Sequence, residues 1–207
     1  GDADRLGVVD EKGHVLWADE LMSIFLPEII KNGEDILFDV KCSQALEDMI
    51  NHYGGNPIMW KTGHSLIKQK MTEVGCKFGG EMSGHIFFAD DYYGYDDAIY
   101  VAARLLELLS KTNKSLSELR SIIPVYHSTP EMRMEAKDDE EKFKITKKAI
   151  EYFTKNYDCI TVDGVRILFG DGWGLVRSSN TQPVIVCRFE ANSIDRRDEI
   201  TVSYTHL

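Results

Sequence analysis

Strand-like and helix-like segments alternate between residues 36 and 110, and this alternation restricts the fold more than any other feature of the sequence. Short apolar runs are followed by stretches with helical periodicity, in which Ile99, Leu105 and Leu106 are expected to share one apolar face. Such alternation favours an α/β domain with a mainly parallel, mixed sheet covered by helices. The expected strands are 36–40, 57–60, 76–78 and 86–88, and the expected helices are 43–52, 65–74 and 96–110.

The residues before this region predict a β-hairpin and a helix. Residues 7–17 alternate in polarity around a turn at Gly13. Asp19 is the expected N-cap of a following helix that reaches Ile29. Pro27 lies inside that helical pattern, so we expect it to kink or split the helix.

The pattern changes beyond a boundary that we place between residues 122 and 134. A charged run at 137–144 begins a helix that extends to about residue 156. Asp163 and Gly164 form a hairpin turn between two β-rich runs, and GWGLVR and VIVCRFE supply two more strands. This part of the chain is therefore expected to be an α+β C-terminal domain with an antiparallel sheet.

The overall charge limits the classes of partner. Lys and Arg number 24 against 34 Asp and Glu, a net charge of −10, which disfavours nucleic-acid binding. A phosphorylated small molecule would need a local basic cluster. The four cysteines are dispersed, which disfavours a CxxC or zinc motif and indicates a reducing, cytoplasmic location. No apolar run is long enough to span a bilayer, so no membrane partner is expected.

The opening segment GDADR places two carboxylates one residue apart. Asp2 and Asp4 can therefore point at one hard cation from an extended loop. A calcium EF-hand loop starting at Asp2 fails, because Gly13 stands where that loop needs a glutamate. A solvated acidic turn without a metal remains the alternative.

Two cationic or donor side chains follow strands of the expected parallel sheet. Lys41 follows strand 36–40, and the segment WKTGHS, with Lys61 and His64, joins strand 57–60 to the next helix. The carboxyl ends of parallel strands are where ligands tend to bind. Lys41 as an exposed strand end and His64 as a helix-start residue are the structural alternatives.

The segment GGEMSGH, at residues 79–85, combines glycines with three polar side chains at every second position. In an extended loop Glu81, Ser83 and His85 point to one side, and together they offer the donors and acceptors that suit a sugar ring. A ligand-free polar turn is the alternative.

The segment VRSSNTQP, at residues 176–183, separates two expected strands. Arg177 can hold a phosphate through two parallel hydrogen bonds, and the hydroxyl and amide groups of Ser178, Ser179, Thr181 and Asn180 can complete a cradle. The alternative is a plain hairpin loop.

In this order, the motifs GDADR, KTGH, GEMSGH and RSSNTQP resemble those of the α-D-phosphohexomutase family, most closely bacterial phosphomannomutase/phosphoglucomutase. The resemblance covers residues 1 to about 190, and the four motifs together are far more specific than any one of them. It implies a Mg²⁺-dependent isomerase with four domains around a cleft. Such an enzyme interconverts hexose 1-phosphates and hexose 6-phosphates through a bisphosphate intermediate, using a phosphoserine.

The resemblance also implies roles for individual residues. Asp2 and Asp4 match two of three metal-binding aspartates, and Arg5 lies beside them near the phosphoserine. Lys41 and His64 match cleft residues that help in general acid/base catalysis. The implied contacts to sugar hydroxyls are Glu81, Ser83 and His85, and those to phosphate are Arg177, Ser179, Asn180 and Thr181.

The chain departs from the family pattern at its start. The first metal aspartate would precede Gly1, and the domain that carries the phosphoserine has no counterpart. We therefore expect residues 1–33 to be the end of domain two, 34–123 domain three and 124–207 domain four. Without the phosphoserine we expect this C-terminal part alone to bind Mg²⁺ poorly and to be inactive.

Three hypotheses about function follow. The first is a phosphohexomutase acting on mannose or glucose phosphates, a preference that Met82 in GEMSGH favours. The full-length protein is expected to be a monomer or a weak dimer. The second is a non-catalytic sugar-phosphate binding module, and the third is a phosphatase that uses Asp2 and Asp4. Residues 201–207 are expected to form either a short strand or a non-native tail.

Overall fold

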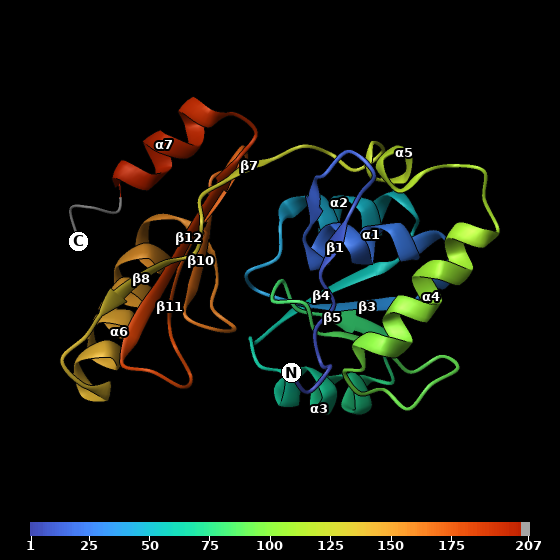
Figure 1. Cartoon of the computed structure of the whole chain (residues 1–207). Coiled ribbons are helices and arrows are strands. Elements are labelled where there is room, and N and C mark those ends of the chain that lie inside the picture. The colour runs from blue at the N-terminus through green and yellow to red at the C-terminus, as the bar shows by residue number, and fades with distance from the viewer. Residues whose placement is uncertain (204–207) are drawn as a thin grey trace. The chain divides into compact units, whose positions relative to one another are not determined.

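The computed structural model describes residues 1–203, which form two compact units (Figure 1). The first unit is Gly1–Pro124, and the second begins at Val125. Each unit has its own sheet and is described separately below. Among the described residues, no helix is both long and apolar enough to cross a membrane.

The sheet of the first unit has four strands in the order β4-β3-β5-β6. β3 pairs in parallel with β4 and β5, whereas β6 pairs antiparallel with β5. This confirms the predicted mixed and mainly parallel sheet. The strands are β3 (Asp35–Asp39), β4 (Asn56–Trp60), β5 (Phe78–Gly80) and β6 (Ile86–Phe88).

Helices cover both faces of this sheet. Adjacent residues of β6 point to opposite faces, as the pleat requires. The ring of Phe88 meets that of Phe25 in α1 at 5.2 Å between centroids, while Phe87 joins the cluster that contains Ile67 of α3. The helices are α1 (Ala18–Ile29), α2 (Gln44–His52), α3 (His64–Val74), α4 (Ala98–Ser110) and α5 (Leu116–Arg120).

The predicted hairpin and first helix are both present, but the helix starts differently from the prediction. β1 (Val8–Val9) and β2 (Val15–Leu16) pair antiparallel. Helix α1 begins at Ala18 with Trp17 as its N-cap, so the predicted cap at Asp19 is wrong. The Asp19 carboxylate instead accepts a hydrogen bond from the Ser43 amide at 2.8 Å, at the start of α2. Pro27 lies near the end of α1 and does not split it.

Two details of the predicted register are wrong. Asp97 caps α4, which therefore buries Val101, Leu105 and Leu108 and leaves Ile99 and Leu106 72% and 67% exposed. The third strand begins at residue 78 rather than 76 and includes Gly79 and Gly80. A Cβ atom on Gly79 would lie 2.7 Å from the Leu37 carbonyl oxygen, so glycine lets β5 approach β3 closely.

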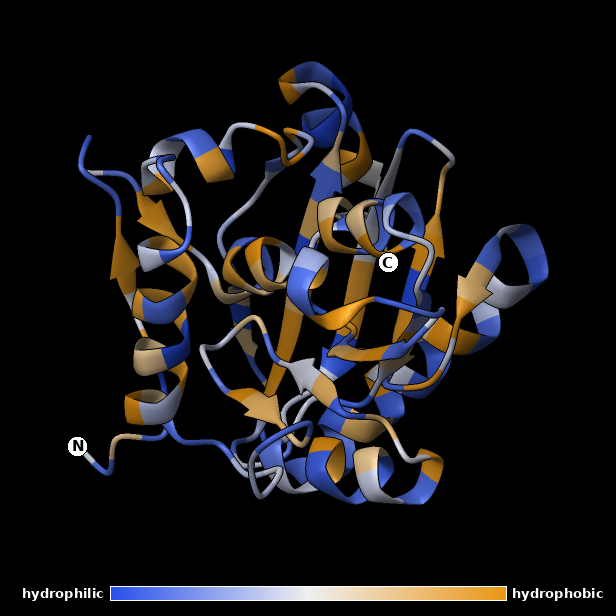
Figure 2. Cartoon of the chain, turned by 90° about the vertical axis from the view of Figure 1, so that its right-hand side faces the viewer, coloured by the Kyte–Doolittle hydropathy of each residue, from blue (hydrophilic) through white to orange (hydrophobic). Residues whose placement is uncertain are grey.

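The second unit contains an antiparallel sheet in the order β7-β12-β11-β10-β9, and β8 also pairs with β12. Figure 2 shows hydrophobic residues in strands and helices of the chain, and in this unit most residues of β10, β11 and β12 are buried. This confirms the predicted antiparallel domain. The strands are β7 (His127–Ser128), β8 (Met132–Glu135), β9 (Asp158–Ile160), β10 (Val165–Leu168), β11 (Gly172–Ser178) and β12 (Val184–Ala191).

Two helices pack on one face of this sheet, α6 (Asp139–Asn156) and α7 (Ile194–Ser203). Phe153 of α6 and Ile200 of α7 share a core with Val165 and Cys187 of the sheet. The strand considered for residues 201–207 does not form at 201–203, which end α7, and residues 204–207 lie outside the described part.

Candidate functional site

Three segments of the first unit that the sequence singled out meet at one edge of its sheet. They are the end of β3 with Lys41, the turn from β4 into α3 with His64, and the β5–β6 turn with residues 81–85. The carboxyl ends of the parallel strands β3 and β4 place the first two at this edge. The opening loop also reaches it, because the Leu6 amide donates to the Gly84 carbonyl at 3.2 Å.

The Asp39 carboxylate connects these segments through its hydrogen bonds. Its carboxylate is fully buried, and it accepts hydrogen bonds from the Thr62 hydroxyl at 3.0 Å and the Met82 amide at 3.2 Å. Lys41 Nζ lies 3.8 Å from the same carboxylate and is itself buried. Asp39 therefore fixes the KTGH turn and the GEMSGH loop relative to the end of β3.

Glu81 is the second buried carboxyl of the site. Its Oε1 atom accepts a hydrogen bond from the Gly63 amide at 2.6 Å, and its residue exposure is 2%. Burial raises the pKa of Glu81 to about 7, and repulsion from the Asp39 carboxylate adds to the rise. Near neutral pH Glu81 can therefore act as a hydrogen-bond donor or as an acceptor.

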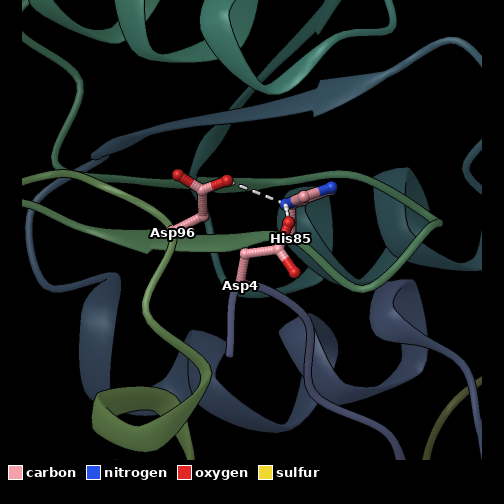
Figure 3. A group of neighbouring side chains, drawn as sticks. All are labelled: Asp4, His85 and Asp96. Carbon is pink, nitrogen blue, oxygen red and sulfur yellow. Dashed lines mark ion pairs between the residues drawn. The ribbon is translucent and has the colours of Figure 1, made fainter. Parts of the chain in front are cut away.

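Asp96 joins the two histidines of the site, and Figure 3 shows its contact with His85. Its Oδ2 atom lies 2.8 Å from Nδ1 of His85 and 3.2 Å from Nδ1 of His64, whose rings stack at 5.3 Å between centroids. Lys68 donates to the other oxygen, Oδ1, at 2.9 Å. Burial lowers the pKa of His85 in spite of the nearby carboxylates, so its imidazole is neutral at pH 7.

The opening loop brings Asp4 to the same histidine. Asp4 Oδ2 lies 3.8 Å from His85 Nδ1, and Arg5 Nε lies 3.6 Å from Asp4 Oδ1. Burial acts to raise the pKa of Asp4, but a hydrogen bond with the Asp2 side chain and the nearby His85 lower it overall. Asp2 and Asp4 thus offer neighbouring oxygen donors, the ligand type that Mg²⁺ prefers.

The predicted phosphate loop lies in the second unit, between β11 and β12. Arg177 is on β11, where its Nε donates to the Asp163 carboxylate at 2.8 Å. Its Nη2 atom is buried and has no hydrogen-bond partner among the described residues. The Ser179 hydroxyl accepts from the amides of Thr181 and Gln182, both at 3.3 Å. These contacts fold the loop into a compact turn with exposed Asn180 and Thr181.

A buried lysine supports this loop from α6. Lys142 Nζ donates to the Ser179 carbonyl at 2.9 Å and to the Gln182 carbonyl at 3.0 Å. One turn further along, Thr146 Oγ1 lies 2.7 Å from Ser178 Oγ. Both ends of the loop are therefore attached to one helix face.

Sequence reasoning missed Asp39, Asp96 and Lys142. Asp39 carried a signal, because a carboxylate at the end of an apolar strand must find partners. Asp96 also carried a signal, because it stands beside Asp97, the N-cap of α4. Capping the helix uses only one of these two adjacent carboxylates, so the other needs a different partner. Lys142 lies in a charged run that looks fully solvated, so nothing local marks it.

Comparison with known proteins agrees with the fold and the motifs. Residues 17–126 match the family model described as "Phosphoglucomutase/phosphomannomutase, alpha/beta/alpha domain III". Residues 131–203 match the model of the C-terminal domain of the same family. The chain belongs to the phosphoglucomutase/phosphomannomutase family. Helix α1 belongs to the residues expected to end domain two, but it lies within residues 17–126, which match the model of domain III.

Relatives in this family are similar over nearly the whole chain. A phosphomannomutase/phosphoglucomutase of Pseudomonas putida is 48% identical over 200 residues, which cover 93% of this chain and 42% of the relative. A phosphoglucomutase of Neisseria gonorrhoeae is 41% identical over 197 residues. A crystal structure of a family protein from Burkholderia thailandensis superposes with a TM-score of 0.91 at 40% identity, and covers 100% of this chain and 44% of that one. The chain therefore spans less than half the length of these relatives.

Proposed function

We propose that this chain is the C-terminal part of a phosphohexomutase that interconverts the 1-phosphates and 6-phosphates of mannose and glucose through a bisphosphate intermediate. The convergence of Glu81, His85 and Asp4 at one sheet edge is the observation that supports it most directly, together with family membership. We also propose a cytosolic enzyme, monomeric or weakly dimeric, in keeping with its four free cysteines.

The His85–Asp96 pair gives the site a group that accepts a proton. The Asp96 carboxylate, 2.8 Å from Nδ1, favours a proton on that nitrogen, which leaves the lone pair on Nε2 of a neutral His85. A sugar hydroxyl that attacks a phosphoryl group must lose its proton, and Nε2 can take it. We therefore propose His85 as the proton acceptor, in addition to the sugar contact expected for it. His64 and Lys41 remain the proposed neighbours that assist proton transfer.

Recognition of the sugar would rest on the GEMSGH loop. Glu81 is held by the Gly63 amide, and we propose that its carboxyl group contacts a sugar hydroxyl. Ser83 is exposed at the tip of the loop, and Lys41 lies near the same carboxylates. Donors and acceptors fixed in this way favour one arrangement of hydroxyls over another.

Two further groups complete the proposal. Asp2 and Asp4 would hold Mg²⁺, which neutralises phosphate charge when bound, with Arg5 beside them. In the second unit the Arg177 guanidinium would bind phosphate, and Ser179, Asn180 and Thr181 would surround it.

This chain by itself contains the proposed sugar and phosphate loops, so we expect binding without turnover. Calorimetry with glucose 1-phosphate should give a dissociation constant on the order of millimolar, near 4 kcal/mol. Arg177→Ala should remove that binding. Equal binding by the Arg177→Ala variant would contradict the role given to the phosphate loop.

The complete gene product tests the activity. It should convert mannose 1-phosphate into mannose 6-phosphate, and EDTA should abolish the conversion. His85→Ala should lower kcat by roughly 10² to 10⁴-fold, whereas His52→Ala, an exposed residue of α2, should not. Release of inorganic phosphate without isomerisation would instead support the phosphatase hypothesis.

A further inference from the structure

Three side chains of the first unit direct metal-binding atoms toward one point (Figure 3). Asp4, His85 and Asp96 each offer one ligand atom, and these three atoms lie within 4.8 Å of one another. The three residues come from the opening loop, the β5–β6 turn and the segment before α4.

The spacing of these atoms fits a small tetrahedral ion. Zinc bonds of about 2.0–2.1 Å in a tetrahedron place the ligand atoms about 3.3 Å apart. Two separations fall on either side of this value, because His85 Nδ1 lies 2.8 Å from Asp96 Oδ2 and 3.8 Å from Asp4 Oδ2. Shifts of about half an ångström in these two distances would match three corners of a tetrahedron, and in a site with three protein ligands a water molecule takes the fourth.

The chemistry of the donors selects the metal. One imidazole nitrogen and two carboxylate oxygens suit zinc, cobalt or nickel, whereas Mg²⁺ prefers oxygen ligands alone. The hydrogen bond from Lys68 Nζ to Asp96 Oδ1 orients this carboxylate, so that its other oxygen faces the histidines. A carboxylate held from behind is a common feature of zinc sites.

We propose that Asp4, His85 and Asp96 form a zinc-class site, separate from the oxygen-donor pair Asp2 and Asp4 expected to hold Mg²⁺. The two sites share only Asp4. A bound Zn²⁺ ion occupies His85 Nδ1 and both carboxylates, so it changes the residues that would face the sugar. Zinc binding itself does not depend on the proposed mutase function.

Calorimetric titration of the 207-residue chain with Zn²⁺, in the presence of excess Mg²⁺, tests the site. One Zn²⁺ ion should bind per chain, and His85→Ala and Asp96→Asn should each weaken binding by about 10 to 100-fold. His52→Ala, on the exposed end of α2, is the matched control and should bind as tightly as the original chain. Co²⁺ should give the visible absorption of a tetrahedral ion.

Two results would overturn the proposal. The first is unchanged zinc affinity in His85→Ala, and the second is loss of zinc binding in Asp2→Asn with no loss in His85→Ala, which would assign the ion to the acidic pair. Circular dichroism checks that each variant folds. If His85→Ala does not fold, nitrogen NMR of the original chain replaces it. Zn²⁺ must then shift the Nδ1 resonance of His85 and leave that of His52 unshifted.

Discussion

Replacement of Lys142 by methionine should detach the phosphate loop from α6. Methionine keeps most of the buried stem and removes the ammonium, which now donates to the carbonyls of Ser179 and Gln182 at 2.9 and 3.0 Å. A hydrogen bond to a charged group contributes about 1.5–3 kcal/mol. The ion pair with Asp139 adds little, because the Asp139 side chain is 71% exposed.

The expected loss is smaller than the sum of the two hydrogen bonds. Removing the ammonium also relieves the cost of burying a charge, which offsets part of the effect. We therefore expect Lys142→Met to lower the free energy of unfolding by about 3 kcal/mol, chiefly through the two carbonyls left unpaired. Lys144→Met, an exposed lysine of the same helix, should change it by less than about 0.5 kcal/mol.

Urea unfolding followed by circular dichroism measures this difference, and hydrogen exchange locates it. Amides of residues 179–184 should exchange faster in Lys142→Met and at the original rate in Lys144→Met, because the loop opens more often. Equal stability of the two variants, with unchanged exchange in the loop, would show that Lys142 does not hold it. Other contacts would then have to hold the phosphate loop in place.

The remaining predictions concern a buried acid and a tight turn. Folded Glu81 keeps its proton to about pH 7, while the unfolded chain loses it near the ordinary glutamate pKa of 4.5, so ionisation favours unfolding across this window. Between pH 5 and pH 8, urea titrations should show the free energy of unfolding of the original chain falling by up to about 3 kcal/mol more than that of Glu81→Gln. Parallel pH profiles of the two proteins would refute this. Gly164→Ala should lower stability by about 3 kcal/mol or more, because a Cβ atom there would lie 2.2 Å from a carbonyl oxygen of β11. Gly13→Ala, also at positive φ but with open space around it, should cost only about 1 kcal/mol; equal melting temperatures of the two variants would contradict the steric argument.

Local patterns in the sequence were sufficient for the order and type of most elements. Alternation of apolar runs and helical stretches predicted the mixed sheet of the first unit, and the Asp163–Gly164 turn predicted the β9–β10 hairpin. These features depend on residues two to four positions apart, whose side chains share a face or a turn. The predicted face of α4 was wrong because its phase depends on where Asp97 caps the helix.

The support of the site was decided by tertiary structure. Asp39 reaches the Met82 amide 43 positions away, and Lys142 reaches the Ser179 carbonyl 37 positions away. His85 meets Asp96 only because the β5–β6 turn and the approach to α4 are folded side by side. The sequence by itself determined which chemical groups the loops carry. The partners that set the protonation and orientation of these groups come from packing between distant segments. No short-range pattern in the sequence encodes that packing.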